Sequence, residues 1–127
     1  MTKNPVIWFE IDVQDMPRAK AFYEAVFGVT LEPLKTPDSG PSETWAFPTQ
    51  REGAGAAGAL AKIPGGSNGE GIGTIVYFSS QDCAVETERV VPSGGRVVKE
   101  KSPIGEYGYL ALAADLEGNL FGIHSGR

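Results

Sequence analysis

Acidic and aromatic side chains alternate near the start of the chain. Trp8, Glu10 and Asp12 share one parity, so an extended strand would point all three to the same face. Carboxylates two residues apart on a strand lie about 7 Å apart, too far to share one proton but close enough to flank a cation or a hydroxyl group. Glu10 is therefore a candidate ligand contact, whereas Asp12, near the strand end, is more simply explained as solvated or bonded to local backbone.

A second aromatic candidate follows from an internal repeat. Residues 75–95 are a fainter copy of residues 8–28, and the offset of 67 residues places Tyr77 opposite Glu10. A repeat of about half the chain length predicts that the fold is built twice, with a site between the halves. Broad rings with one polar handle suit the walls of a site for a flat organic ligand, so Trp8 and Tyr77 are candidate contacts. The alternative is that both rings only fill the interior.

Periodicity and turn residues predict the elements that hold these positions. Alternation from Val6 to Val13 predicts a strand, and Asp15 as N-cap with Gly28 as a left-handed stop predicts a helix after it. This helix is expected to turn Ala19, Phe22, Tyr23, Val26 and Phe27 toward the strand and Arg18, Lys20 and Glu24 outward. Further strands are expected at 29–34, 43–48, 59–63, 74–79, 96–99, 109–114 and 120–124, with turns at 37–41 and 103–108 and a helix from Asp82 to near Pro92. Each half is therefore βαβββ, which makes an α+β fold.

Length and composition indicate one globular domain. The chain has 127 residues, of which 41% are hydrophobic and 21% charged, enough to bury a core without covalent staples. We expect a single domain over residues 1–127, with module 1 at about 1–63, a glycine-rich linker at 64–73 and module 2 at about 74–127.

Charge and cysteine content exclude several classes of partner. The net charge is −5, the pI is about 4.8, and no cluster of Lys or Arg exceeds a pair, so nucleic acid is not an expected partner. Without an apolar run near 18 residues or a signal-like leader, we expect a cytoplasmic protein with no membrane contact. Cys83 is the sole cysteine, which excludes an intrachain disulfide.

Three weaker candidates have simple structural explanations. His124, the sole histidine, could be an acid–base group but is more typical of a strand-end residue. Cys83 corresponds to Met16 in the repeat and is expected to be a small buried hydrophobe. The glycine-rich segments 53–58 and 64–73 are expected to be connectors, because neither has the G-K-[ST] ending of a phosphate loop.

Two motifs carry a resemblance to a known family. They are the FYxxxFG pattern from Phe22 to Gly28 and the D-x-x-G-N turn from Asp115 to Asn119. With the two strand-to-helix segments, they resemble the glyoxalase, bleomycin-resistance and extradiol-dioxygenase superfamily, often called vicinal oxygen chelate, over nearly the whole chain. The resemblance implies two βαβββ modules forming a cupped, glyoxalase-like sheet that encloses a ligand, commonly in a homodimer. Residues 105–109 would then be a lip over the cup, carrying Tyr107 or Tyr109.

The resemblance also implies where a metal would be bound, and this chain departs from it. Enzymes of the superfamily hold a divalent metal at positions that correspond to Trp8, Ile75 and Gly122, with a fourth, less securely aligned, within residues 57–60. Indole, alkyl and hydrogen side chains offer no lone pair to a hard metal, and residues 57–60 are apolar. We therefore expect no metal and no other cofactor at these positions.

The leading hypothesis is a glyoxalase-like or bleomycin-resistance-like homodimer that binds a small organic ligand without metal. Its ligand-binding residues would be Trp8, Glu10, Tyr77 and Tyr109. One alternative is a metal-dependent lyase, isomerase or dioxygenase with an atypical site from Glu10, Asp12 and His124. A second alternative is an interaction subunit whose cup is filled by its own side chains. The catalytic residues, the ligand and any reaction stay undetermined.

Overall fold

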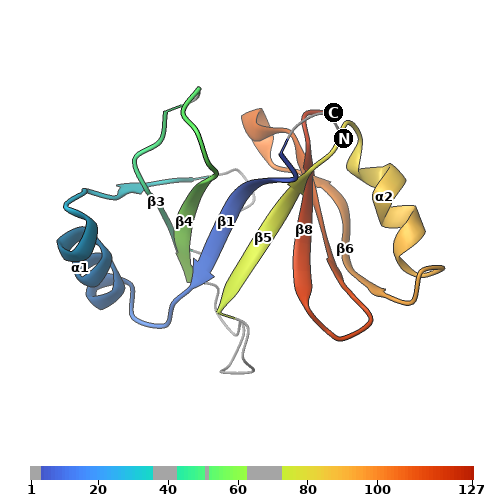
Figure 1. Ribbon diagram of the computed structural model, residues 1–127, viewed down its shortest axis with the longest axis horizontal. Coiled ribbons are helices and arrows are strands. Elements are labelled where there is room, and N and C mark those ends of the chain that lie inside the picture. Colours follow the sequence, from blue (N-terminus) through green and yellow to red (C-terminus); the bar gives the residue numbers. More distant parts are fainter. Residues whose placement is uncertain (1–3, 36–42, 51, 63–72) are drawn as a thin grey trace. The chain divides into compact units, whose positions relative to one another are not determined.

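The computed structural model describes residues 4–35, 43–50, 52–62 and 73–127, which fall into two compact units (Figure 1). The first unit is Trp8–Thr74, and the second is Ile75–Arg127 together with Met1–Ile7. The predicted turn at 37–41 and nearly all of the predicted linker at 64–73 lie outside the described residues.

The first unit has a four-stranded order, β2-β3-β4-β1. Its elements are β1 (Val6–Asp12), α1 (Met16–Phe27), β2 (Glu32–Pro33), β3 (Glu43–Ala46) and β4 (Ala57–Lys62). β1 pairs in parallel with β4, and β3 pairs antiparallel with both β2 and β4. The predicted strands at 29–34 and 43–48 are longer than the observed β2 and β3, and β4 begins two residues before its prediction.

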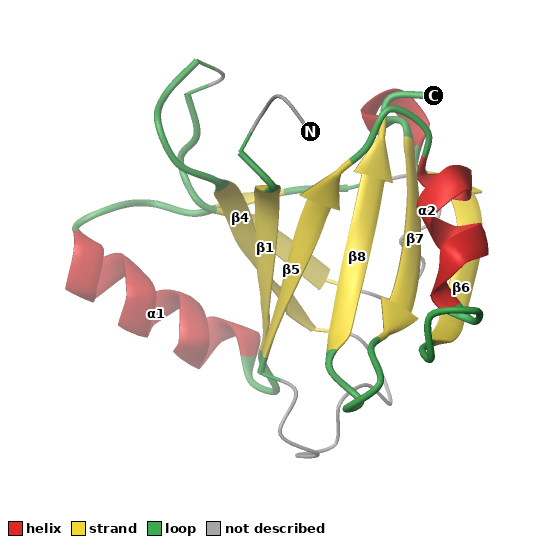
Figure 2. Ribbon diagram, turned by 45° about the vertical axis from the view of Figure 1, so that its right-hand side comes forward, coloured by secondary structure: helices red, strands yellow, loops and turns green. Residues whose placement is uncertain are grey.

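The second unit repeats this order as β5-β8-β7-β6 (Figure 2). Its elements are β5 (Thr74–Ser79), α2 (Cys83–Val90), β6 (Arg96–Pro103), a 3₁₀ turn η1 (Gly105–Tyr107), β7 (Tyr109–Ala114) and β8 (Leu120–Ser125). β5 pairs in parallel with β8, β7 pairs antiparallel with β8 and β6, and β6 carries two register shifts. The βαβββ order predicted for each half is confirmed.

Both helices begin at the predicted aspartates. The carboxylate of Asp15 accepts a hydrogen bond from the backbone N–H of Arg18 at 3.1 Å, and that of Asp82 accepts one from Ala84 at 3.0 Å. α1 ends at Gly28, whose φ of 66° is the left-handed conformation that stops a helix. None of the described helices is long and apolar enough to cross a bilayer.

A separate core lies beneath each helix. In the first unit, Met16, Leu31 and Leu60 form the buried cluster, and Ile11 and Val13 pack against it, which confirms that this face of β1 meets α1. In the second unit the cluster is Cys83, Ala111 and Ile123. Cys83 is fully buried, as predicted for a small hydrophobe.

The predicted apolar side of α1 is only partly used. Ala19 and Tyr23 pack against the core, but Phe22, Val26 and Phe27 are 60%, 56% and 64% exposed. A helix turns by about 100° per residue, so Phe22, one position before Tyr23, points past the edge of the contact, whereas Val26 and Phe27 are the last two residues of α1. The expected apolar face is therefore wider than the buried one.

Glu24 is predicted to point outward, and it does not. It is half-buried, and its carboxylate accepts a hydrogen bond from the backbone N–H of Leu31 at 2.8 Å. Leu31 belongs to the core cluster, so the acid fixes the chain that leaves α1 against that core. Apolar spacing could not reveal this contact, because it depends on the path of the backbone after Gly28.

Candidate functional site

Trp8 and Glu10 form a hydrogen-bonded pair on β1. The indole Nε1–H donates to Glu10 Oε2 at 2.9 Å, and both residues are half-buried. Ile11 and Val13, of the opposite parity, pack beneath α1, so the pair lies on the face of the first unit that carries no helix. We call this surface the Trp8 face. It also carries Asp12, and the strand parity predicted for these three residues is confirmed.

Small side chains surround this pair on the neighbouring strand. Trp8 is in register with Ala57 and Glu10 with Ala59, and directly opposed residues of paired strands project to the same face. On this strand pair the indole ring of Trp8 and the carboxylate of Glu10 are therefore much larger than the methyl groups opposite them. This combination suits an aromatic or aliphatic body with one donor or cationic group.

A second indole–carboxylate pair provides an internal contrast. Trp45 Nε1–H donates to Glu43 Oε2 at 3.4 Å. Trp45 is in register with Leu60 of the core cluster, so this ring lies on the α1 side, and Lys20 Nζ sits 3.4 Å from its ring centroid. Its position opposite Leu60 thus separates Trp45 from the Trp8 face, where no helix covers the ring.

Tyr77 lies against a glycine in the second unit. It is in register with Gly122 of β8, and a Cβ placed on Gly122 would overlap Tyr77 Cδ2. The ring therefore occupies the volume that any side chain at 122 would need. Phe121 and Ile123, the neighbours of Gly122, pack on the α2 side, which places the buried Tyr77 ring on the helix-free face of this unit, called the Tyr77 face.

The fourth predicted contact, Tyr109, is on the other side of its sheet. Tyr109 is in register with Ser125, whereas Tyr77 is in register with Gly122, so strand alternation puts the two rings on opposite faces. The Tyr109 ring packs against the cluster of Cys83, Ala111 and Ile123 beneath α2. The structure therefore does not bring Tyr109 to the Tyr77 face. The parity of Tyr109 with the buried Ala111 is the sequence signal that places it there.

Sequence reasoning did not identify Lys101 as an anchor of α2. Its Nζ donates to Asp82 Oδ1 at 2.8 Å and lies 4.7 Å from the centroid of the Tyr109 ring. The hydrogen bond from Lys101, followed by the backbone N–H of Ala84, lowers the pKa of Asp82 below its ordinary value of 3.8. The hydrogen bond to Asp82 in turn raises the pKa of Lys101. The ion pair fastens β6 to the start of α2, and no local pattern links residues 19 positions apart.

His124 is the last of the predicted candidates and belongs to the Tyr77 face. It is in register with Ser79 and shares the parity of Gly122. Its Nε2 lies 2.6 Å from the backbone oxygen of Tyr107 in η1. The predicted lip thus contains the 3₁₀ turn, which His124 contacts at the end of β8.

The positions at which the superfamily binds a metal do not fit one in this chain. Trp8 Nε1 carries a proton and donates a hydrogen bond to Glu10, Ile75 is a buried alkyl group, and the space at Gly122 is filled by the Tyr77 ring. Within the residues that the structure describes, no group of three or more His, Cys, Asp or Glu side chains could hold an ion.

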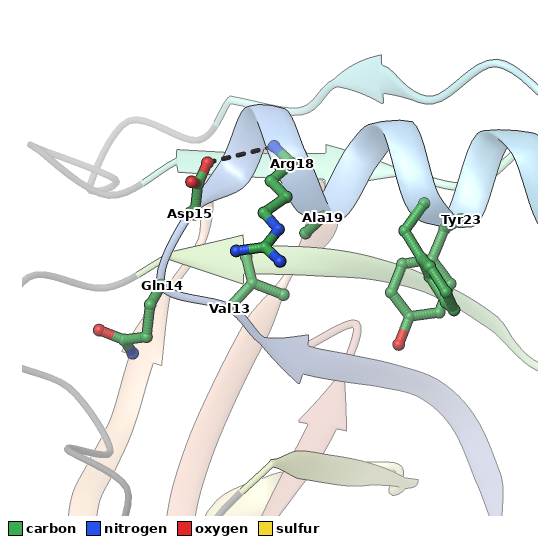
Figure 3. A pocket seen from close by; sticks show the side chains of 7 residues that line it. Val13, Gln14, Asp15, Arg18, Ala19 and Tyr23 are labelled. Atoms are coloured by element: carbon green, nitrogen blue, oxygen red, sulfur yellow. Dashed lines mark hydrogen bonds between the residues drawn. The ribbon is translucent and has the colours of Figure 1, made fainter.

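Two open grooves border the helices. One, of about 280 Å³, lies where β1 turns into α1, and Figure 3 shows Arg18 reaching from the helix toward Val13 and Gln14 there. The other, of about 260 Å³, lies between α2 and strands β7 and β8 and is lined mainly by apolar groups such as Leu116 and Phe121. Neither groove includes Trp8, Glu10 or Tyr77, so these three residues are candidates from strand geometry alone.

Family models decide where the chain belongs. Residues 6–123 match the model of the Glyoxalase/Bleomycin resistance protein/Dioxygenase superfamily. The chain is a member of this superfamily. The resemblance stated from the two motifs is thereby confirmed.

Relatives and solved structures agree with this membership. Proteins named "Putative glyoxylase CFP32" from Mycobacterium bovis and Mycobacterium tuberculosis are each 28% identical over 118 residues, which cover 91% of this chain and 43% of theirs. The chain thus spans less than half the length of the curated relatives it matches.

Solved structures show the fold alone, because their identity to this chain is low. A variant of the methylmalonyl-CoA epimerase of Streptomyces coelicolor, in complex with 2-nitronate-propionyl-CoA, gives a TM-score of 0.69 at 15% identity and covers 96% of both chains. The methylmalonyl-CoA epimerase of Mycobacterium tuberculosis gives 0.69 at 17% identity, over 97% of this chain and 88% of its own. These likenesses confirm the predicted α+β, glyoxalase-like fold.

Proposed function

We propose that this superfamily member binds a small organic ligand without metal and that Trp8 and Glu10 contact that ligand. The observation that carries the proposal is the hydrogen bond from Trp8 Nε1 to Glu10 Oε2 at 2.9 Å, on a sheet face without a helix. The bond fixes the ring and the acid relative to each other, so their arrangement exists before any ligand binds. Preorganised groups lose less conformational entropy on binding.

The chemistry of the pair favours a flat molecule with a cationic or hydroxyl group. The indole provides a broad apolar surface, and the carboxylate accepts hydrogen bonds or pairs with a cation. A net charge of −5 adds a weak long-range attraction for cations. Tyr77, whose ring fills the space above Gly122, is proposed as a further ligand contact from the second unit.

Ligand binding is tested most directly through the fluorescence of Trp8. The chain has two tryptophans, so the Trp45→Phe protein reports on Trp8 alone. A panel of aromatic amines, phenols and acyl-CoA thioesters should contain compounds that both change Trp8 emission and raise the melting temperature. Glu10→Gln should weaken binding of an amine about tenfold, because the neutral amide retains the shape but loses the charge.

Trp45, the indole of the second indole–carboxylate pair, supplies the matched control. In the Trp8→Phe protein the remaining indole, Trp45, faces α1 beneath Lys20, and its emission should not respond to the same compounds. Glu43→Gln should leave the affinity unchanged. If no compound shifts melting, or if Trp45 responds as strongly as Trp8, the proposed site is wrong, and the hypothesis of an interaction subunit gains support.

The remaining features of the proposal are tested separately. Metal analysis of tag-free protein should find no stoichiometric Ni, Mn, Fe or Zn, since the superfamily positions carry no donor; a stoichiometric metal would favour the lyase, isomerase or dioxygenase alternative. We further propose that the protein is a homodimer, as the superfamily resemblance implies, and that it is cytoplasmic. Light scattering during size-exclusion chromatography measures the oligomeric state, and cell fractionation measures the location.

A further inference from the structure

The imidazole of His124 is held in one orientation by a backbone contact. Its Nε2 lies 2.6 Å from the carbonyl oxygen of Tyr107. A carbonyl oxygen only accepts hydrogen bonds, so Nε2 must carry the proton that it donates. In the neutral ring the other nitrogen, Nδ1, is then an acceptor with a lone pair. The contact with η1 therefore selects a tautomer as well as a ring orientation.

The surroundings of this acceptor are set by the strand register. Ser79 lies directly beside His124, and Tyr77 lies beside Gly122 two positions back along the same two strands. All four belong to the Tyr77 face, so an imidazole, a hydroxyl group and an aromatic ring project from neighbouring positions. The absence of a Cβ at Gly122 leaves room for the Tyr77 ring against β8, two positions before His124 on the same face.

We propose that His124 is a ligand contact whose Nδ1 accepts a hydrogen bond from an O–H or N–H group of a small organic molecule on the Tyr77 face. The ligand class is a phenol, an alcohol or an amide with an apolar body. The proposal deepens the proposed function, on which it rests for Tyr77 as a ligand contact. His124 would then be the hydrogen-bond acceptor of the second unit, as Glu10 is that of the first unit.

Nitrogen NMR tests the inference directly, because the chain has a single histidine. Tag-free protein labelled with ¹⁵N-histidine should show one imidazole, with a protonated Nε2 and an unprotonated Nδ1. Phenol should move the Nδ1 signal upfield measurably, as expected for an acceptor that gains a hydrogen bond. Its methyl ether, anisole, has the same ring without the donor and should leave Nδ1 in place. Dispersed backbone amide signals throughout the titration would show that the fold persists.

Two variants separate the acceptor from a structural role. His124→Gln keeps an amide N–H near the position of Nε2, so the contact with Tyr107 and the melting temperature should persist, while phenol affinity falls about fivefold. Tyr109→Phe alters a phenol on the α2 side of the same sheet and should leave the Nδ1 response intact.

Three outcomes would overturn the inference. They are a proton on Nδ1, no Nδ1 response to phenol, and an equal response to phenol and anisole. Trp8 emission in the Trp45→Phe protein reports independently on the first unit. A Trp8 response without an Nδ1 response would leave the proposed function standing and reject His124, whereas the reverse would reject the role of Trp8 and support His124.

Discussion

Each unit packs an aromatic ring onto a glycine, but on different faces. Phe9 lies over Gly58 in the first unit and Tyr77 over Gly122 in the second, and a Cβ added at either glycine would overlap the ring. Both pairs join the first strand of a unit to its parallel fourth strand. Tyr77 corresponds in the repeat to residue 10, one position after Phe9, so strand alternation turns the rings to opposite sides.

This offset of one residue gives the two units different surfaces. Phe9 belongs to an aromatic group beneath α1, 5.9 Å from Phe47, which is itself 5.9 Å from Tyr23. Tyr77 instead lies away from α2, whose core is built from small groups such as Cys83 and Ala111. The same contact between an aromatic ring and a glycine thus strengthens the packing of a helix in the first unit. In the second unit it places an aromatic ring on a helix-free face.

The largest expected effect comes from filling the two glycines. Gly58→Ala and Gly122→Ala should each lower the free energy of unfolding by about 3 kcal/mol, because the added methyl group overlaps a packed ring. Urea unfolding at fixed temperature measures both. The effects should be similar, since the two overlaps are of similar depth.

Controls for these substitutions lie in the same units. Gly73 and Gly126 have no neighbour within 4 Å of an added Cβ, so Gly73→Ala and Gly126→Ala should change stability by less than about 0.5 kcal/mol. Replacing Tyr77 by Ala should make the Gly122→Ala change nearly neutral, because the overlap is gone. Additive effects of the two substitutions would contradict the contact between ring and glycine.

A buried hydroxyl group anchors the second unit where the first uses apolar contacts. Ser125 Oγ accepts from the backbone N–H of Cys83 at 3.0 Å and donates to the carbonyl of Arg127 at 2.8 Å. Ser125→Ala leaves the Cys83 N–H, in a fully buried residue, without its acceptor and should cost about 1.5 kcal/mol. Relative to the wild type, amide hydrogen exchange in this variant should accelerate more in α2 than in α1. Equal acceleration in both helices would contradict a role of Ser125 as a local anchor of α2.

The ion pair at the start of α2 predicts acid sensitivity of the second unit. The Lys101 hydrogen bond lowers the pKa of Asp82 in the folded protein. The ion pair therefore stabilises the fold fully at pH values above the ordinary pKa of 3.8, and this stabilisation is lost as the pH falls through the lowered pKa of the folded state. The melting temperature of the wild type should therefore exceed that of Asp82→Asn at about pH 6, and the difference should shrink below pH 3.8.

Lys101→Met is the matched variant for this pH dependence. It removes the largest cause of the lowered pKa of Asp82 without touching the carboxylate, so the pH profile of its melting temperature should have a smaller acid-dependent fall than the wild type. A wild-type profile that runs parallel to that of Asp82→Asn down to about pH 2 would contradict the role of the ion pair.

The smallest effect is expected at the exposed face of α1. Phe22 and Val26 are more than half exposed, so Phe22→Lys and Val26→Lys should each change the free energy of unfolding of an isolated chain by less than about 0.5 kcal/mol. Tyr23→Lys, one residue from Phe22 but packed on the core, should cost far more. Thermal melts of the three variants distinguish the exposed line of the helix from the buried one.

Most of the fold could be predicted from local sequence because local physics determines it. Asp15, Gly28 and Asp82 cap or stop helices through their own side chain or backbone, and alternation fixes which β1 residues share a face. Boundaries of short strands are less predictable, since β2 is a pair of residues held by β3 rather than by its own pattern.

The candidate site is only partly predictable, because its contacts depend on register between distant strands. The parity of Trp8 and Glu10 follows from one strand, but the overlap of Tyr77 with position 122 requires the pairing of β5 with β8. The bond between His124 and Tyr107 likewise spans 17 positions. Such contacts leave no trace in residue spacing, and only the assembled sheet reveals them.

The ring above Gly122 restricts which sequences lie one mutation away from this protein. A carboxylate at position 122, where superfamily enzymes would hold a metal, would be destabilising if introduced alone, because even its Cβ would overlap Tyr77. Shrinking Tyr77 first would leave a void of aromatic size in the sheet face. Each of the two substitutions alone is destabilising, although both together are sterically possible. A protein with a metal ligand at position 122 could therefore be reached from this sequence only through a less stable intermediate.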